Sequence, residues 1–260
     1  MKSRNGRDSK LRGSVIYIFL VVSVVLVMIA RFFREDYYAV FLCLLTLGLF
    51  HIPVIVEHTL NLTIPQPLEI VVLLFIFASE ILGEIASFYT YIPWWDSMLH
   101  AVNGFLMASI GFALIDLLNN SPRFHFSLSP VFVAFVAFCF SMTVGVIWEF
   151  FEFGMDMFTG SDMQKDYVID HFSSVLLHPE GVNDPVRIDG IEKTALTLSD
   201  GRQVVLEGYL DVGIIDTMKD LLVNCVGALI FSFVGDLYIL GRSRGSFVKK
   251  FIPQMKKRNR

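Results

Sequence analysis

Six apolar segments, each about as long as a membrane-spanning helix, dominate the sequence. They cover roughly residues 14–31, 37–57, 68–89, 97–118, 128–158 and 212–240. A helix of about 20 apolar residues crosses the hydrocarbon core of a bilayer. Hydrophobic residues make up 54% of the chain and charged residues only 18%, whereas soluble domains carry about 25% charged residues. This composition excludes a disordered chain and a typical soluble enzyme, and it predicts an all-α membrane bundle of about six transmembrane helices.

The basic residues are concentrated at the two ends of the chain. Residues 1–13 hold five lysines and arginines against one acid, and residues 241–260 hold eight against none. The positive-inside rule therefore predicts two cytoplasmic tails, which agrees with an even number of spans, although Arg31 and Arg34 in the first short loop oppose it. We interpret the tails as a topology signal, with contact to anionic lipid headgroups as the alternative. No nucleic-acid partner is expected, and the sequence does not identify protein partners.

One long segment between the last two spans, about residues 159–211, is polar enough to lie in water. Its second half predicts a β-hairpin, because alternating residues at 194–198 and 203–208 flank an Asp200-Gly201 turn. With cytoplasmic tails and six spans, this segment is expected on the extracytoplasmic face as a small cap. The predicted organisation is a tail at 1–13, five spans within 14–158, the loop at 159–211, the last span at 212–240 and a tail at 241–260.

Four of the predicted spans carry polar side chains at helical spacing. The sets are Glu80 and Glu84; Asp96, His100 and Asn103; Glu149, Glu152 and Asp156; and Asp216, Asp220 and Asn224. The spacings place each set on one face of its helix. The alternating direction of the spans places all four sets in the outer half of the bilayer. Because ionised groups are unfavourable against lipid, the sequence predicts one shared polar pocket.

Eight carboxylates would meet in this pocket, with few cations nearby. They cannot all remain ionised at short range in a medium of low dielectric constant, so either several are protonated or a divalent cation is bound. Carboxylate oxygens with one imidazole suit Mg²⁺, Mn²⁺, Ca²⁺, iron or zinc. The predicted metal ligands are Glu80, Glu84, Glu149, Glu152, Asp216 and Asp220. His100, oriented by Asp96, is the predicted proton-transfer group, and Asn103 and Asn224 are expected to support the site.

Three of these residues also have a structural interpretation, which the sequence leaves open. Glu80 and Glu84 can be protonated and hydrogen-bonded between helices. Asp96 follows the aromatic pair at 94–95 and can cap the fourth helix. His100 lies one turn deeper on the same face, where a purely structural role is harder to assign.

The order of these motifs resembles the YjdF-like family of bacterial inner-membrane proteins, whose biochemistry is unassigned. The matching elements are Asp96-x-x-x-His100-x-x-x-Gly104-Phe105, Glu149-x-x-Glu152, Gln164-x-Asp166 and Asp216-x-x-x-Asp220, over about residues 70–235. The hairpin at about 185–209 departs from the family pattern. A more distant similarity is to the VanZ-like group, which is associated with glycopeptide-antibiotic resistance. The resemblance implies a bacterial inner-membrane location, and it implies that Gln164 and Asp166 belong to the membrane cluster as a lid.

Three functions are compatible with such a pocket, so the sequence does not decide whether the chain is an enzyme. The leading hypothesis is a metal-dependent protein acting on a membrane lipid or a lipid-linked substrate. A proton or divalent-cation transporter is the second, and a continuous polar track to the cytoplasm would favour it. A non-catalytic scaffold is the third, and a pocket closed to lipid and water would favour it.

Overall fold

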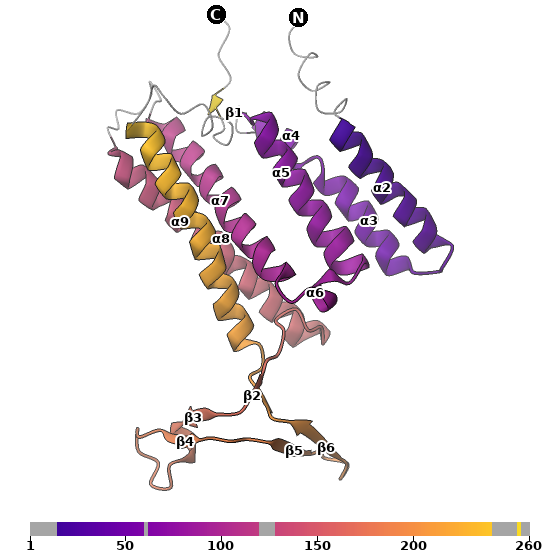
Figure 1. Cartoon of the computed structure of the whole chain (residues 1–260), viewed down its shortest axis with the longest axis vertical. Coiled ribbons are helices and arrows are strands. Elements are labelled where there is room, and N and C mark those ends of the chain that lie inside the picture. The colour runs from indigo at the N-terminus through magenta and orange to yellow at the C-terminus, as the bar shows by residue number, and fades with distance from the viewer. Residues whose placement is uncertain (1–14, 60–61, 120–127, 241–253, 256–260) are drawn as a thin grey trace, which may run out of the picture. The chain divides into compact units, whose positions relative to one another are not determined.

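The computed structural model describes residues 15–59, 62–119, 128–240 and 254–255 (Figure 1). Five helical segments among them are long and apolar enough to cross a membrane. They are α2 (Val15–Phe32), α3 with α4 (Tyr37–Leu49 and Ile52–Thr59), α7 (Trp95–Asn119), α8 (Pro130–Thr159) and α9 (Ile214–Leu240). The prediction of a helical membrane bundle is confirmed. Apart from residues 254–255, the predicted basic tails lie outside the described residues.

The third predicted span, 68–89, is a helix whose winding changes partway. It begins as α5 (Gln66–Phe77), continues as the π-helix η1 (Ala78–Ile85) and is followed by the short α6 (Phe88–Tyr91). It is therefore not one uninterrupted α-helix as the sequence predicts. Helical periodicity and hydropathy carry little information about this change, because both windings keep residues four apart on nearly the same face.

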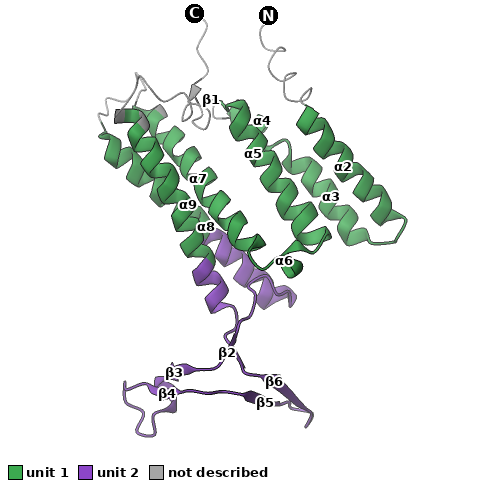
Figure 2. Ribbon diagram, viewed as in Figure 1, with its two compact units in different colours: residues 1–145, 220–260 green, residues 146–219 purple. Residues whose placement is uncertain are grey.

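The chain divides into two compact units (Figure 2). Unit 1 comprises residues 1–145 and 220–260, and unit 2 comprises residues 146–219. The boundary falls inside α8 and α9, so each of these helices contributes residues to both units.

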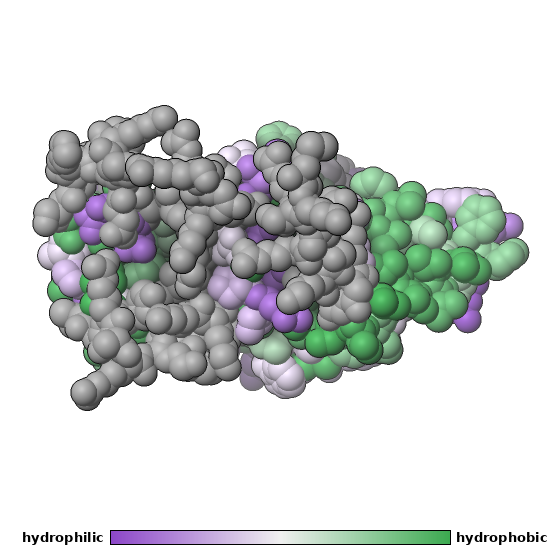
Figure 3. Space-filling model, turned by 90° about the horizontal axis from the view of Figure 1, so that it is seen from above, coloured by the Kyte–Doolittle hydropathy of each residue, from purple (hydrophilic) through white to green (hydrophobic). Residues whose placement is uncertain are grey.

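The described residues of unit 1 form two apolar clusters, one in each of two groups of helices. The first lies among α2, α3, α5 and η1 and includes Leu20, Val24, Cys43, Leu73 and Ile81. The second lies among α7, α8 and α9 and includes Ala108, Phe112, Val133, Ala137, Ala228 and Phe231. Large apolar side chains also remain exposed on α2 and α3, and Figure 3 shows this apolar surface at the right of the view. An apolar outer surface is what contact with lipid requires.

Arg31, at the end of α2, joins three elements of unit 1. Its Nη1 lies 3.0 Å from Oδ2 of Asp36, and its Nη2 donates a hydrogen bond of 2.9 Å to the carbonyl of Ile85, the last residue of η1. The other oxygen of Asp36 accepts from the amide of Ala39 and so caps α3. The arginine that opposes the positive-inside rule therefore has a structural role, because it satisfies a helix-terminal carbonyl and an N-cap carboxylate.

Replacing Arg31 with methionine is expected to destabilise unit 1 by about 2 kcal/mol, because it removes two hydrogen bonds of a charged group. The exposed Arg34, three residues later, provides the matched control as Arg34→Met. Thermal unfolding of the detergent-purified protein measures the difference. Equal melting temperatures for the two variants would show that the contacts of Arg31 contribute nothing.

Side chains from α6 and from the first residue of α7 contact the π-helix. The indole Nε1 of Trp95 donates to the carbonyl of Ala78 at 3.3 Å, and the hydroxyl of Tyr89 lies 3.2 Å from Oγ of Ser79. The ring of Tyr89 packs so closely on Gly83 that a Cβ there would overlap it. π-Helical turns are rare and are frequent at functional sites. The winding of this segment is thus stabilised by contacts with neighbouring elements.

The strands are short and all pair antiparallel. In unit 2, β2 (Val168–Ile169) pairs with β7 (Tyr209–Leu210), β3 (Phe172–Ser174) with β4 (Val186–Ile188), and β5 (Lys193–Thr197) with β6 (Gln203–Glu207); the 3₁₀ turn η2 (Val175–Leu177) follows β3. In unit 1, β1 (Leu62–Thr63) pairs with β8 (Gln254–Met255). The predicted hairpin is confirmed as β5–β6. Its turn closes through the amide of Leu198 and the carbonyl of Arg202, with Gly201 at a φ of 83°.

Candidate metal centre

Helices α7 and α9 approach closely where two glycines face the backbone of the other helix. A Cβ at Gly104 would overlap the carbonyl oxygen of Asn224, and a Cβ at Gly227 would overlap the carbonyl oxygen of Ala101. Small residues permit such close approach between membrane helices, where packing rather than water exclusion drives association. The contact fixes which residues of α9 lie opposite the polar face of α7.

Buried polar groups join α7, α8 and α9 at the same level. Nδ2 of Asn103 donates to Oδ1 of Asn224 at 3.2 Å, and Nδ2 of Asn224 lies 3.6 Å from Sδ of Met142. Oγ of Ser141 donates to the carbonyl of Gly104 at 2.8 Å. The two asparagines that the sequence places beside the site therefore contact each other and link the helices that carry it.

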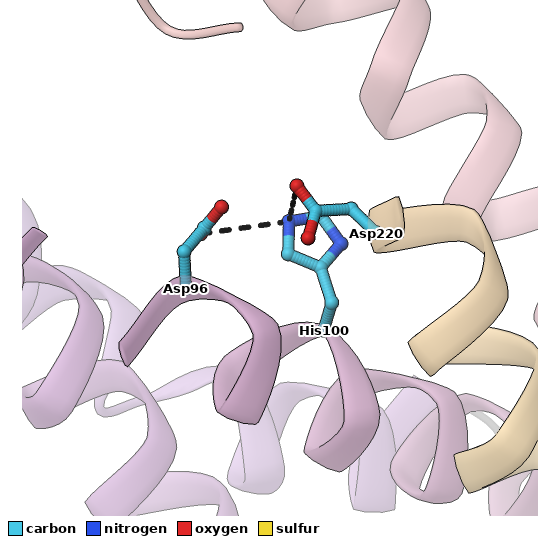
Figure 4. Close-up of side chains that lie close together, drawn as sticks. All are labelled: Asp96, His100 and Asp220. Carbon is cyan, nitrogen blue, oxygen red and sulfur yellow. Dashed lines mark ion pairs between the residues drawn. The ribbon is translucent and has the colours of Figure 1, made fainter. Parts of the chain in front are cut away.

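Two carboxylates converge on one histidine nitrogen (Figure 4). The cluster lies about one helical turn nearer the N-terminal ends of α7 and α9 than the two asparagines. Nε2 of His100 lies 3.6 Å from Oδ1 of Asp96, which precedes it by four residues on α7, and 3.8 Å from Oδ2 of Asp220 on α9. The side chains of His100 and Asp220 are 7% and 1% exposed, whereas that of Asp96 is 29% exposed. The cluster is thus buried on two sides and open at Asp96.

These separations suit ligands of a shared ion better than direct hydrogen bonds. Charge-assisted N–H···O bonds measure about 2.7–2.9 Å, and one N–H cannot point well at two carboxylates. Two ligand atoms on one zinc-sized ion can be separated by up to about 4.2 Å, the sum of two metal–ligand bonds. Both distances from Nε2 fall below this limit, and one ligand atom from each of the three residues lies within 4.8 Å of the others. The three residues are therefore candidates to share one divalent cation.

Glu80 and Glu84 lie on the π-helix η1. Oγ of Ser79 lies 3.4 Å from Oε1 of Glu80. Glu80 is partly buried and Glu84 is exposed. Within the described part of unit 1, the residues able to share one ion are Asp96, His100 and Asp220, without these glutamates. Their role as ligands stays a prediction.

The remaining predicted ligands belong to unit 2, where all three are buried. Glu149 and Glu152 on α8 and Asp216 on α9 are 4%, 7% and 4% exposed. Oε1 of Glu152 accepts from the indole of Trp148 at 2.8 Å, and Oδ2 of Asp216 accepts from the backbone amide of Lys165 at 2.9 Å. Their role as metal ligands also stays a prediction.

The Gln164-x-Asp166 motif lies along the start of α9 within unit 2. The side-chain amide of Gln164 donates to Oγ1 of Thr217 at 2.6 Å. The carboxylate of Asp166 accepts from the amide of Gly213; even so, partial burial together with nearby carboxylates raises the pKa of Asp166 above its ordinary value. The motif therefore contacts the start of α9 within unit 2. Its membership of the membrane cluster and its role as a lid stay predictions.

Asp211 binds two backbone amides of unit 2. Its carboxylate accepts from the amides of Tyr167 at 2.6 Å and Ile215 at 2.7 Å. The second contact is an N-terminal helix cap, and an aspartate just before an apolar helical run is its sequence signal. The first contact has no sequence signal, because its donor is a backbone amide from a distant segment.

Comparison with known proteins identifies the family. The family described as "Predicted membrane protein (DUF2238)" matches residues 15–240, and the chain belongs to it. An uncharacterised protein of Thermotoga maritima is 29% identical over 105 residues, which is 40% of this chain and 52% of that protein, so the chain matches about half the length of this relative. No solved structure matches the chain.

Proposed function

We propose that this DUF2238 member binds a divalent metal ion through Asp96, His100 and Asp220 and acts on a membrane lipid or a lipid-linked substrate. The convergence of two carboxylates on Nε2 of His100, at 3.6 and 3.8 Å, carries the proposal. A neutral imidazole with two carboxylates carries a charge of −2, which a divalent cation cancels. Protonating the imidazole instead leaves these three side chains with a charge of −1, so a divalent cation balances their charge more fully.

The surroundings of Asp96 support a substrate at the level of the lipid headgroups. Tyr91 and Trp94, just before Asp96, are 77% and 59% exposed. Exposed aromatic residues at the end of a membrane helix are typical of the bilayer interface. The most exposed ligand therefore lies next to an interfacial segment, where a lipid headgroup can reach open metal positions. A bound metal would polarise a substrate oxygen or activate water.

The other end of the same helices argues against transport. Beyond the paired asparagines, Ala108, Phe112, Ala228 and Phe231 are fully buried and form an apolar layer. The rings of Phe105 and Phe231 meet edge to face with centroids 5.0 Å apart. A conducting path needs polar groups or water along its length. Ser109 and Ser232 are also buried on these stretches, but the large apolar side chains interrupt the carboxylate and amide groups of α7 and α9. This interruption supports an enzyme-like site over a cation path.

We also infer that the family is the one that the motifs resemble, the YjdF-like proteins, and that the chain lies in the bacterial inner membrane with both ends in the cytoplasm. The basic residues of the two tails support this orientation under the positive-inside rule.

The metal content of the full-length protein, purified in detergent without chelator and resupplied with Mn²⁺ or Zn²⁺, tests the proposal. Elemental mass spectrometry is expected to find about one equivalent in the wild type and a loss of most of it in Asp220→Asn and His100→Ala, because three ligands leave no redundancy. Asp236→Asn, on the same helix, is the matched control and should keep the metal. A metal-free wild type, or Asp220→Asn with full metal content, would refute the site.

Two further samples extend this measurement. Glu149→Gln tests the sequence-based prediction that this glutamate is another ligand, since a ligand substitution lowers the metal content and a neutral one leaves it unchanged. Incubating the metal-loaded wild type and Asp220→Asn with a polar lipid extract of the host cells tests the substrate class. A lipid product formed by the wild type alone supports it, and identical lipid profiles speak against it.

A further inference from the structure

Aspartate carboxylates bind the backbone of residues 163–167 in unit 2. These aspartates come from the end of α8 and from around the start of α9. Asp156 accepts from the amides of Met163 at 2.7 Å and Gln164 at 2.8 Å. Asp216 accepts from the amide of Lys165 at 2.9 Å, and Asp211 accepts from the amide of Tyr167 at 2.6 Å. Four of the five amides of this short segment therefore donate to carboxylates from residues 156, 211 and 216.

Close packing complements these hydrogen bonds. A Cβ at Gly213 would lie 2.8 Å from Cβ of Gln164, and Gly213 has a φ of 78°, which favours glycine. Nζ of Lys219 donates to the hydroxyl of Tyr167 at 2.8 Å. The segment is thus held through its backbone as well as its side chains.

We propose that the two aspartates of the Asp216-x-x-x-Asp220 motif have different roles: Asp216 is a positioning residue that fixes residues 163–167, and Asp220 is the metal ligand. One oxygen of Asp216 is committed to the amide of Lys165, whereas Asp220 faces Nε2 of His100 at 3.8 Å. The groups of described residues able to share an ion do not include Asp216. The assignment of Asp220 rests on the proposed function, and the assignment of Asp216 does not.

Hydrogen exchange of the full-length protein in detergent micelles, followed by mass spectrometry, tests the role of Asp216. In Asp216→Ala the amide of Lys165 is expected to exchange at least about tenfold faster, because its charged acceptor is lost. Asp216→Asn keeps an acceptor oxygen and should show a smaller increase. Amides of the β5–β6 hairpin serve as the reference within the same unit and should be unchanged.

The same variants also give the metal readout. Asp216→Asn is expected to keep the metal that Asp220→Asn loses. Equal loss of metal in both would overturn the division of roles, and a wild-type exchange rate of the Lys165 amide in Asp216→Ala would overturn the positioning role. If the wild type binds no metal, the proposed function fails alone, because the exchange rates still decide what Asp216 does. If Asp216→Ala does not fold, the smaller increase expected in Asp216→Asn carries the exchange test.

Discussion

Gly227→Ala is expected to force α9 away from α7, lower the melting temperature substantially and reduce metal binding. The added methyl group would overlap the carbonyl oxygen of Ala101, a backbone atom that can move only with its helix. Forcing extra atoms into a packed interface costs about 1–3 kcal/mol, which exceeds the gain of up to about 1 kcal/mol from replacing glycine by alanine in a helix. Asp220 lies two turns before Gly227 on α9, so the same displacement moves its carboxylate away from His100.

Gly48→Ala is the matched control for this prediction. Gly48 lies within α3, and a Cβ there meets no atom within 4 Å. The substitution should therefore keep or slightly raise stability, since it removes only the conformational freedom of glycine. Melting temperature and metal content are measured for both variants. If Gly227→Ala behaves like Gly48→Ala in both measurements, the close contact between α7 and α9 does not position the site.

The polar faces of α7 and α9 could be predicted from residue spacing alone. Asp96 and His100, four residues apart, had to share a face of their helix, and Asp220 occupies the corresponding face of α9. A shared pocket could be predicted as well, but which side chains face each other in it could not, because that depends on which turns of the two helices meet. Gly104 and Gly227 set that register through contacts with the opposite backbone, and sequence shows the glycines but not their partners.

The roles of the other acidic residues show a second limit. Asp216 and Asp220 have the same side chain and lie one helical turn apart on α9. Even so, Asp216 binds a backbone amide and Asp220 faces a histidine. Every residue except proline offers a backbone amide, so such a partner leaves no trace in the sequence. The π-helix that carries Glu80 and Glu84 could not be predicted from the sequence for a similar reason. Trp95 and Arg31, which belong to other helices, donate hydrogen bonds to backbone carbonyls of this segment.

Removing divalent metal with a chelator is expected to lower the melting temperature of the wild type and to leave Asp220→Asn unchanged. A ligand that binds only the folded state stabilises it by about 2.7 kcal/mol at a free concentration one hundred times its dissociation constant. The wild type should therefore lose several degrees on addition of chelator and regain them when Mn²⁺ or Zn²⁺ is added in excess. Asp236→Asn, outside the cluster, should respond as the wild type does.

The double variant His100→Leu/Asp220→Leu separates a functional cluster from a scaffold. Replacing a buried polar cluster by apolar residues of similar volume is often neutral or stabilising, because the cost of burying charge disappears. If the cluster serves metal chemistry, neither chelator nor added metal should change the melting temperature of the double variant. That temperature should be no lower than the melting temperature of the metal-free wild type. If the double variant melts at a much lower temperature, the polar cluster itself stabilises the contact between α7 and α9. The scaffold hypothesis then takes precedence over the enzyme hypothesis.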